Sequence, residues 1–111
     1  MQDKPPSILW KDEMIERFCR ETVADMSLPD DADSRWRWVG PLYATGYWSQ
    51  GEIIDLFPTS GMKDQRHLER QVEWCCKRTS HDSGSEWLLK RLGDEGFSFQ
   101  EFVRRECAEE R

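Results

Sequence analysis

The chain has 111 residues, 34% of them charged, with a formal net charge of −6 and a pI near 4.9. This length fits one domain, because a chain of about 110 residues buries roughly 65% of its surface on folding, enough for a single core. The negative charge argues against a general affinity for nucleic acid or anionic membranes.

The first third of the chain carries most of the acidity, since residues 1–34 hold nine Asp and Glu against four Lys and Arg. We expect residues 1–7 to form a flexible tail that the Pro5-Pro6 pair closes. Residues 8–26 then place apolar side chains at helical spacing, which predicts a helix of about five turns. Residues 28–34 are acidic and rich in turn-forming types, and they predict a surface loop.

Residues 35–48 hold five of the thirteen aromatic residues. Trp36 and Trp38 alternate with arginines, as in a short strand, yet Asp33 or Ser34 could equally cap one helical turn that ends at Gly40-Pro41. We expect irregular or short helical structure in this segment.

A capped helix is predicted at 49–57. Ser49 and Glu52 have capping-box spacing, in which each side chain accepts a hydrogen bond from the other residue's backbone N–H. Trp48 and Ile53 flank the box where two apolar side chains can pack together and fix the entry angle. This helix start and the one at Ser98 are the best-specified features of the chain.

The next predicted helix runs over 64–78, after a breaker at 58–61. One stripe of this helix is apolar and should face the core: Leu68, Val72, Cys75, Cys76 and Thr79. A second line is either another packing surface or a surface that faces a partner: His67, Gln71, Trp74 and Arg78.

Two shorter helices should complete the fold. Ser83 with Glu86 has capping-box spacing before an apolar helix that Gly93 closes, and Ser98 with Glu101 repeats the device before a last helix at 99–109. The sequence therefore predicts an all-α, compact single domain spanning 1–111, with about five short helices and an irregular aromatic-rich segment between the first two.

No catalytic or metal-binding constellation is evident. His67, Cys75, Cys76 and His81 lack the paired spacing of zinc ligands, and no nucleophile elbow or glycine-rich phosphate loop occurs. The four cysteines (Cys19, Cys75, Cys76 and Cys107) fall in amphipathic helices, where we expect reduced, buried thiols. We therefore expect a protein that is not an enzyme and binds no cofactor. No segment resembles a signal peptide or a membrane span, so we expect a cytoplasmic location.

A small acidic chain of this kind suits a stoichiometric inhibitor or adaptor that docks on another protein, here one that is basic and possibly nucleic-acid-binding. Immunity proteins and small phage-encoded inhibitors of bacterial defence systems belong to this physical class. Two docking surfaces compete. One is acidic (Glu13, Glu16, Asp30, Asp31 and Asp33), and the other is aromatic and basic (Arg35, Trp36, Arg37, Trp38 and Tyr43).

The alternative is a DNA-binding transcriptional regulator. Residues 49–57 resemble the first helix of a helix-turn-helix motif, and the following helix offers side chains that can contact base edges: Gln65, Arg66, Arg70 and Gln71. Ile54 and Pro58 depart from the motif, which favours a small residue and a glycine at the corresponding places.

Overall fold

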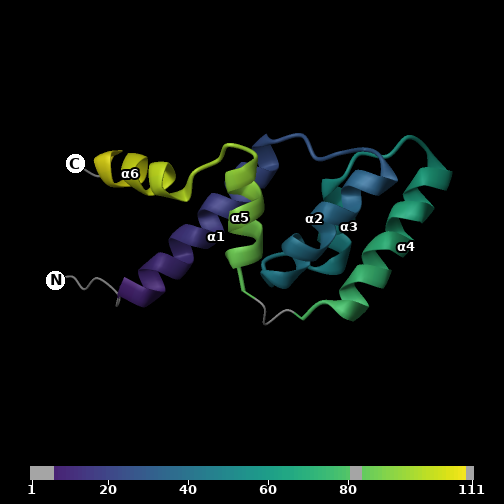
Figure 1. Cartoon of the computed structure of the whole chain (residues 1–111), viewed down its shortest axis with the longest axis horizontal. Coiled ribbons are helices and arrows are strands. Elements are labelled where there is room, and N and C mark those ends of the chain that lie inside the picture. The colour runs from purple at the N-terminus through teal and green to yellow at the C-terminus, as the bar shows by residue number, and fades with distance from the viewer. Residues whose placement is uncertain (1–6, 81–83, 110–111) are drawn as a thin grey trace.

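The computed structural model describes residues 7–80 and 84–109, and within these ranges it contains six α-helices and no strand. The all-α prediction is therefore confirmed. The helices form an elongated body of 54 × 25 × 21 Å (Figure 1). Residues 1–6 of the expected tail lie outside the described residues, whereas Ser7 already belongs to the first helix. The helices are α1 (Ser7–Asp25), α2 (Ala32–Ala44), α3 (Gln50–Leu56), α4 (Met62–Arg78), α5 (Glu86–Asp94) and α6 (Phe99–Glu109).

Helix α2 is longer than the irregular or short helical structure predicted for residues 35–48, and it begins inside the segment 28–34 that was expected to be a surface loop. It runs from Ala32 to Ala44, and Asp31, rather than Asp33 or Ser34, caps it by accepting a hydrogen bond from the Ser34 backbone N–H at 3.0 Å. Gly40 and Pro41 do not end the helix. A proline inside a helix costs about 3 kcal/mol, but the buried apolar residues of α2 offset this cost by packing: Trp38, Val39, Leu42 and Ala44.

The helical conformation sorts the four alternating residues of this segment into two faces. Successive residues on a helix are turned by about 100°, so Arg35 and Trp38 share one face, with Trp36 and Arg37 outside it. Arg35 is fully buried and Trp38 is 5% exposed, whereas Trp36 and Arg37 are exposed. Arg35 and Trp38, both predicted to be docking residues, therefore belong to the interior.

The capping device predicted for α3 is present in full. The Ser49 side chain accepts from the Glu52 N–H at 3.2 Å, and the Glu52 carboxylate accepts from the Ser49 N–H at 2.8 Å. At α6 the Glu101 N–H donates to the Ser98 hydroxyl at 3.2 Å. The cap predicted at Ser83 falls outside the described residues.

Two helix boundaries differ from the predictions. Helix α4 begins at Met62 rather than near Asp64, because Gly61 serves as its N-cap with φ of 139°. Helix α5 continues past Gly93 to Asp94. It ends where Gly96 takes a φ of 98°, with the Phe97 N–H donating to the Leu92 carbonyl at 2.9 Å. A left-handed glycine combined with this hydrogen bond is the Schellman arrangement that satisfies the last carbonyls of a helix.

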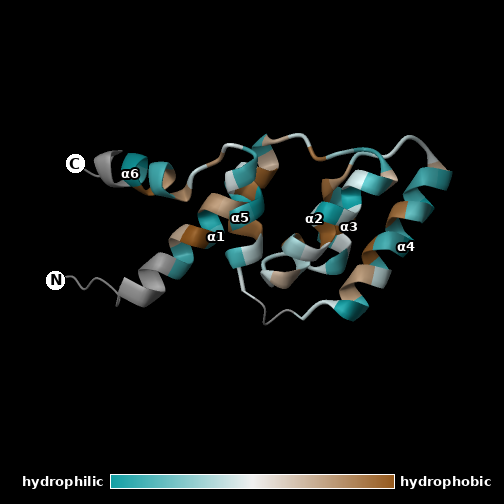
Figure 2. Ribbon diagram, viewed as in Figure 1, coloured by the Kyte–Doolittle hydropathy of each residue, from teal (hydrophilic) through white to brown (hydrophobic). Residues whose placement is uncertain are grey.

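Helix α2 lies in the middle of the molecule and packs against α3, α4 and α5, while α1 packs against α6 at the end remote from α4 (Figure 1). The aromatic cluster of the fold joins α1 to α6, because the Phe18 ring lies 5.5 Å from that of Phe99 and 5.4 Å from that of Phe102. Along α4, hydrophobic residues alternate with hydrophilic ones (Figure 2).

Candidate functional site

The exposed side of α4 is a stripe of basic and aromatic side chains. Its members follow the 3.6-residue period of a helix, and all are exposed. We call this stripe the α4 outer face: Lys63, Arg66, His67, Arg70, Trp74, Lys77 and Arg78. The opposite side of the same helix is the predicted core stripe, which is confirmed for the buried Leu68, Val72, Cys75 and Cys76. The last predicted member, Thr79, follows the helix as its C-cap and is only partly buried.

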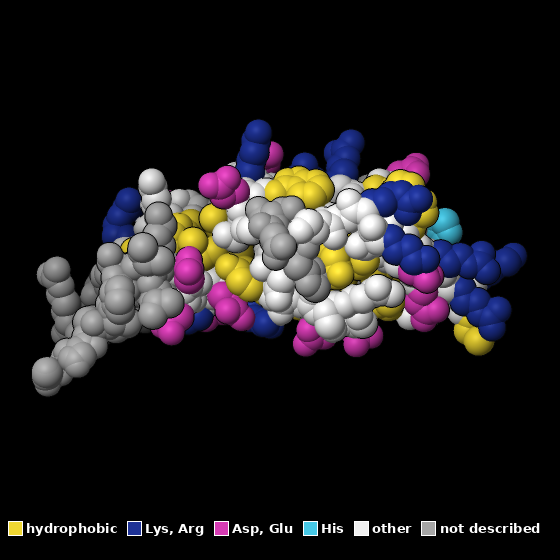
Figure 3. Space-filling view, turned by 90° about the horizontal axis from the view of Figure 1, so that it is seen from below, with side chains coloured by type: hydrophobic (Ala, Val, Ile, Leu, Met, Phe, Trp, Pro, Cys, Tyr) yellow, Lys and Arg dark blue, Asp and Glu magenta, His cyan; other side chains and the backbone are white. Residues whose placement is uncertain are grey.

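Most of the positive charge on this face has no acidic partner among residues 7–80 and 84–109. Lys63, Arg66 and Arg70 form no ion pair with any other described residue, whereas Lys77 lies 3.6 Å from Glu73. Lys and Arg side chains gather at one end of the molecule around the exposed histidine, and acidic side chains are scattered more widely (Figure 3). A chain with a net charge of −6 thus has a locally basic surface.

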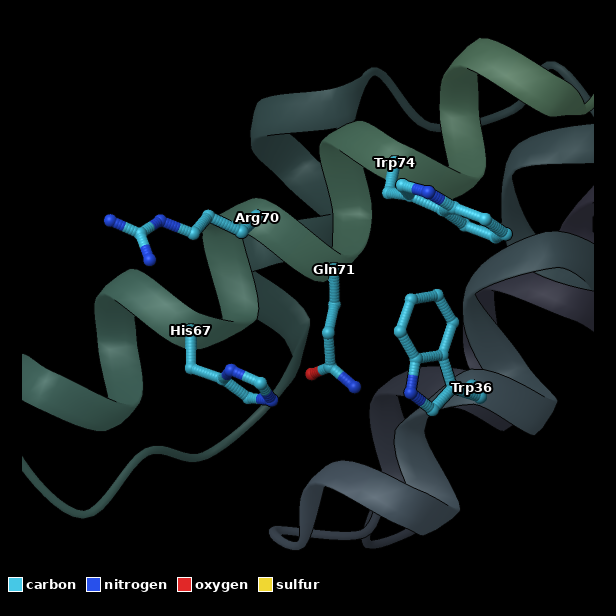
Figure 4. Close-up of a pocket in the computed structure, with 5 residues that line it drawn as sticks. All are labelled: Trp36, His67, Arg70, Gln71 and Trp74. Carbon is cyan, nitrogen blue, oxygen red and sulfur yellow. The ribbon is translucent and has the colours of Figure 1, made fainter.

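Two half-exposed tryptophans from different helices meet beside this face. Trp36 of α2 and Trp74 of α4 are 40% and 50% exposed, and their rings pack edge to face at 5.4 Å between centroids. The Arg78 guanidinium lies 3.9 Å from the Trp74 ring centroid, which is a cation–π contact. Together with His67, Arg70 and Gln71, the two rings line an open hollow of about 540 Å³, the tryptophan hollow (Figure 4).

Gln71 holds the floor of the tryptophan hollow. It is 2% exposed, and its amide nitrogen donates to the Ala32 carbonyl at the start of α2 over 2.8 Å. That bond fixes the amide orientation, because a flipped amide would set two oxygens against each other. The side-chain oxygen then has no hydrogen-bond partner among the described residues, and the amide points into the hollow (Figure 4). Gln71, one of the predicted base-reading residues, is therefore buried.

A second hollow, of about 660 Å³, adjoins the first toward the N-terminus of α4 and shares His67 and Arg70 with it. Its other lining residues are Ser60, Lys63, Asp64 and Arg66. An aromatic hollow thus passes directly into a basic one along a single helix. Of the remaining predicted base-reading residues, Gln65 accepts from the Thr59 hydroxyl and donates to Glu69, while Arg66 and Arg70 stay exposed.

The acidic residues of the predicted docking surface lie on two elements, α1 and the segment that leads into and begins α2. Glu13 and Glu16 lie on α1, and Glu16 pairs with Arg20 at 2.8 Å. Asp31 caps α2, and Asp33 lies in the first turn of that helix, where a negative charge stabilises the helix dipole. Glu16, Asp31 and Asp33 therefore each have a structural explanation, whereas Arg35 donates to the backbone carbonyl of Asp30 and not to its carboxylate.

The buried thiols show no sign of nucleophilic character. Burial raises the pKa of Cys19 to about 12 and that of Cys76 to about 11, and it also raises the pKa of Cys75. A thiol with a raised pKa is protonated at neutral pH, and only the thiolate attacks or binds metal. In the part of the chain that the structure describes, no group of three or more His, Cys, Asp or Glu side chains converges to hold a metal ion.

Sequence reasoning found part of this site. The line of His67, Gln71, Trp74 and Arg78 follows from helical spacing, but the contact between Trp36 and Trp74 could not be predicted, because it depends on α2 being helical.

No protein-family model, curated protein or solved structure matches the chain. Among the described helices, none combines the length and apolar character needed to cross a bilayer.

Proposed function

We propose that the chain is a non-enzymatic protein-binding inhibitor or adaptor whose docking surface is the α4 outer face together with Trp36. The observation that carries the proposal is the exposed Trp36–Trp74 pair with Arg78 over it. Tryptophan, tyrosine and arginine are the residue types that most often dominate binding energy at protein interfaces. A folded chain gains by burying large aromatic rings, so two adjacent rings left half exposed mark a surface that a partner covers.

The same surface is favoured over the acidic one by its continuity. The α4 outer face runs along one helix beside two adjoining hollows, whereas the acidic side chains lie on different elements and several are held in caps or ion pairs. Trp36 and Arg37 of the predicted aromatic-basic surface remain exposed, and Tyr43 is partly buried against the core.

Affinity capture with matched baits tests this function. The wild-type chain, a Trp36→Ala/Trp74→Ala variant, Arg70→Glu and the remote control Arg104→Glu would each be exposed to lysate of the cells that naturally make the chain. We expect a protein that the wild type and the control retain and the other two baits lose. If all four baits retain the same proteins, the α4 outer face is not the docking surface.

The second candidate, a DNA-binding regulator, is supported by the exposed Arg66 and Arg70 on a helix that follows a short capped helix. One of the four predicted base-reading residues, Gln71, is buried against α2 and is therefore not available to contact DNA. A salt titration of duplex DNA binding tests it. A steep fall in affinity with salt that disappears in Arg66→Ala/Arg70→Ala would support the regulator.

A further inference from the structure

We propose that the partner presents an acidic segment to this surface, with one large apolar side chain in the tryptophan hollow and carboxylates along the basic end of α4. This inference rests on the proposed docking function and adds the chemistry of the occupant. It differs from the expectation drawn from the overall charge, which favours a basic partner.

Charge complementarity carries the acidic part of the inference. Lys63, Arg66 and Arg70 line the hollow at the N-terminal end of α4, and none of them has an acidic partner among the described residues. Interfaces juxtapose opposite potentials, and arginine binds a carboxylate through two parallel hydrogen bonds. Glutamate or aspartate side chains placed one or two turns from an apolar anchor would reach these groups.

The tryptophan hollow carries the apolar part. Its walls are the half-exposed rings of Trp36 and Trp74, and its floor is closed by the buried Gln71 side chain, whose amide nitrogen donates to the Ala32 carbonyl. An open hollow with two aromatic walls fits a large apolar side chain, because covering the two rings removes apolar surface from water.

The same geometry disfavours single-stranded nucleic acid as the occupant. Stacking of a base needs an open aromatic face. Arg78 lies 3.9 Å over the Trp74 ring, and Trp36 packs against that ring nearly perpendicularly, at 84°.

Peptide display defines the occupant directly. A library of random peptides of roughly twelve residues, long enough to follow such a groove, would be selected on the wild-type chain and counter-selected on Trp36→Ala/Trp74→Ala. We expect enriched peptides with net negative charge and one Trp, Phe, Leu or Met. In fluorescence anisotropy their affinity should fall about tenfold or more in Arg70→Glu, and it should weaken with added salt. Arg104→Glu, the same charge change on α6, should leave it unchanged.

Several outcomes would overturn the inference. Neutral or basic enriched peptides, or no enrichment over the counter-selection, would exclude an acidic segment. A labelled oligothymidine that binds the wild type more tightly than any selected peptide, and loses affinity in Arg70→Glu, would assign the surface to nucleic acid. Sedimentation that shows a dimer abolished by Trp74→Ala would assign it to a second copy of the chain. Circular dichroism melting of each variant separates lost binding from lost folding.

Failure of this inference and failure of the proposed function give different results. If affinity capture still depends on Trp36, Trp74 and Arg70 while acidic peptides do not bind, the docking surface stands and its ligand chemistry is different. If the captured proteins are indifferent to all of these substitutions, the docking function itself fails at this surface.

Discussion

The guanidinium of Arg35 on α2 donates two hydrogen bonds, of 3.0 and 2.6 Å, to the carboxylate of Asp64 in the first turn of α4. Arg35 is fully buried and also donates to the carbonyls of Asp30 and Pro58. Asp64 in turn accepts from the Ser60 N–H at 3.0 Å, just before the helix begins. The Arg35–Asp64 pair therefore fixes the position of α2, which carries Trp36, relative to α4, which carries Trp74. These two helices form the tryptophan hollow.

Removing the buried arginine should therefore cost far more than removing its exposed neighbour. Breaking a buried ion pair by deleting one partner typically costs about 3–5 kcal/mol. Because the Asp64 side chain left behind is 22% exposed and can be partly hydrated, we expect Arg35→Ala to lower the free energy of unfolding by an amount near the lower end of this range. Arg37→Ala, two residues away on the exposed side, should change it by less than about 0.5 kcal/mol. Urea denaturation followed by circular dichroism measures both. Equal effects would show that Arg35 is not a structural residue.

Acidification should weaken the fold through Asp64. The hydrogen bonds from Arg35, followed by the Ser60 N–H, lower the pKa of this carboxyl from 3.8 to about 2. Because its pKa is lower in the folded chain than in the unfolded chain, added protons favour unfolding. The contribution is complete above the unfolded value and is lost as the pH falls through about 2. We expect the midpoint of urea unfolding to fall less steeply with decreasing pH over this range in Asp64→Asn than in the wild type. An unchanged pH profile in that variant would exclude Asp64 as its source.

A matched pair of glycines should respond in opposite directions to alanine. A Cβ at Gly40 of α2 would lie 2.6 Å from the Trp87 ring, whereas a Cβ at Gly93 of α5 meets nothing within 4 Å. We expect Gly40→Ala to destabilise the chain by about 1 kcal/mol, the low end of the usual cost of overpacking, because the half-exposed Trp87 ring must shift away from the new methyl group. Gly93→Ala should stabilise it by about 0.4–1 kcal/mol because it reduces the entropy of the unfolded chain. Thermal unfolding of both variants checks the signs, and a stabilised Gly40→Ala would contradict the packing.

The contribution of the α3 capping box to stability should be measurable by substituting Ser49 alone. Ser49→Ala removes the acceptor for the Glu52 N–H, and loss of a serine cap typically costs about 1 kcal/mol. Ser49→Asp should restore most of that stability, since aspartate is an equally good cap. Chemical denaturation of the two variants distinguishes a capping role from a general tolerance for substitution at this exposed position.

An element of the fold can be predicted from the sequence when the interactions that stabilise it join residues close together in the chain. The Ser49–Glu52 box and the core stripe of α4 repeat at short spacings that local geometry dictates, and both were predicted correctly. For residues 35–48 the sequence predicts only irregular or short helical structure, because Gly40 and Pro41 are strong local breakers, while the packing that carries helix α2 through them comes from α3, α4 and α5. Residues distant in sequence supply the stabilisation, so no short window of the chain contains it.

The candidate site shows the same difference between local and long-range interactions. The line of His67, Gln71, Trp74 and Arg78 could be predicted from helical spacing alone. The burial of Arg35 and Gln71 could not, since their partners, Asp64 and the Ala32 carbonyl, are 29 and 39 residues away. Both had been assigned to binding surfaces on residue type. Their long-range hydrogen bonds instead make them part of the frame that holds the tryptophan hollow.

Hydrogen exchange of the chain with and without its captured partner tests the central claim most directly. If the α4 outer face and Trp36 form the docking surface, the partner should slow amide exchange in peptides that cover residues 33–37 and 63–78 and leave those of α6 unchanged. Protection confined to α1 and the acidic loop at 28–34, with α4 unaffected, would contradict the account.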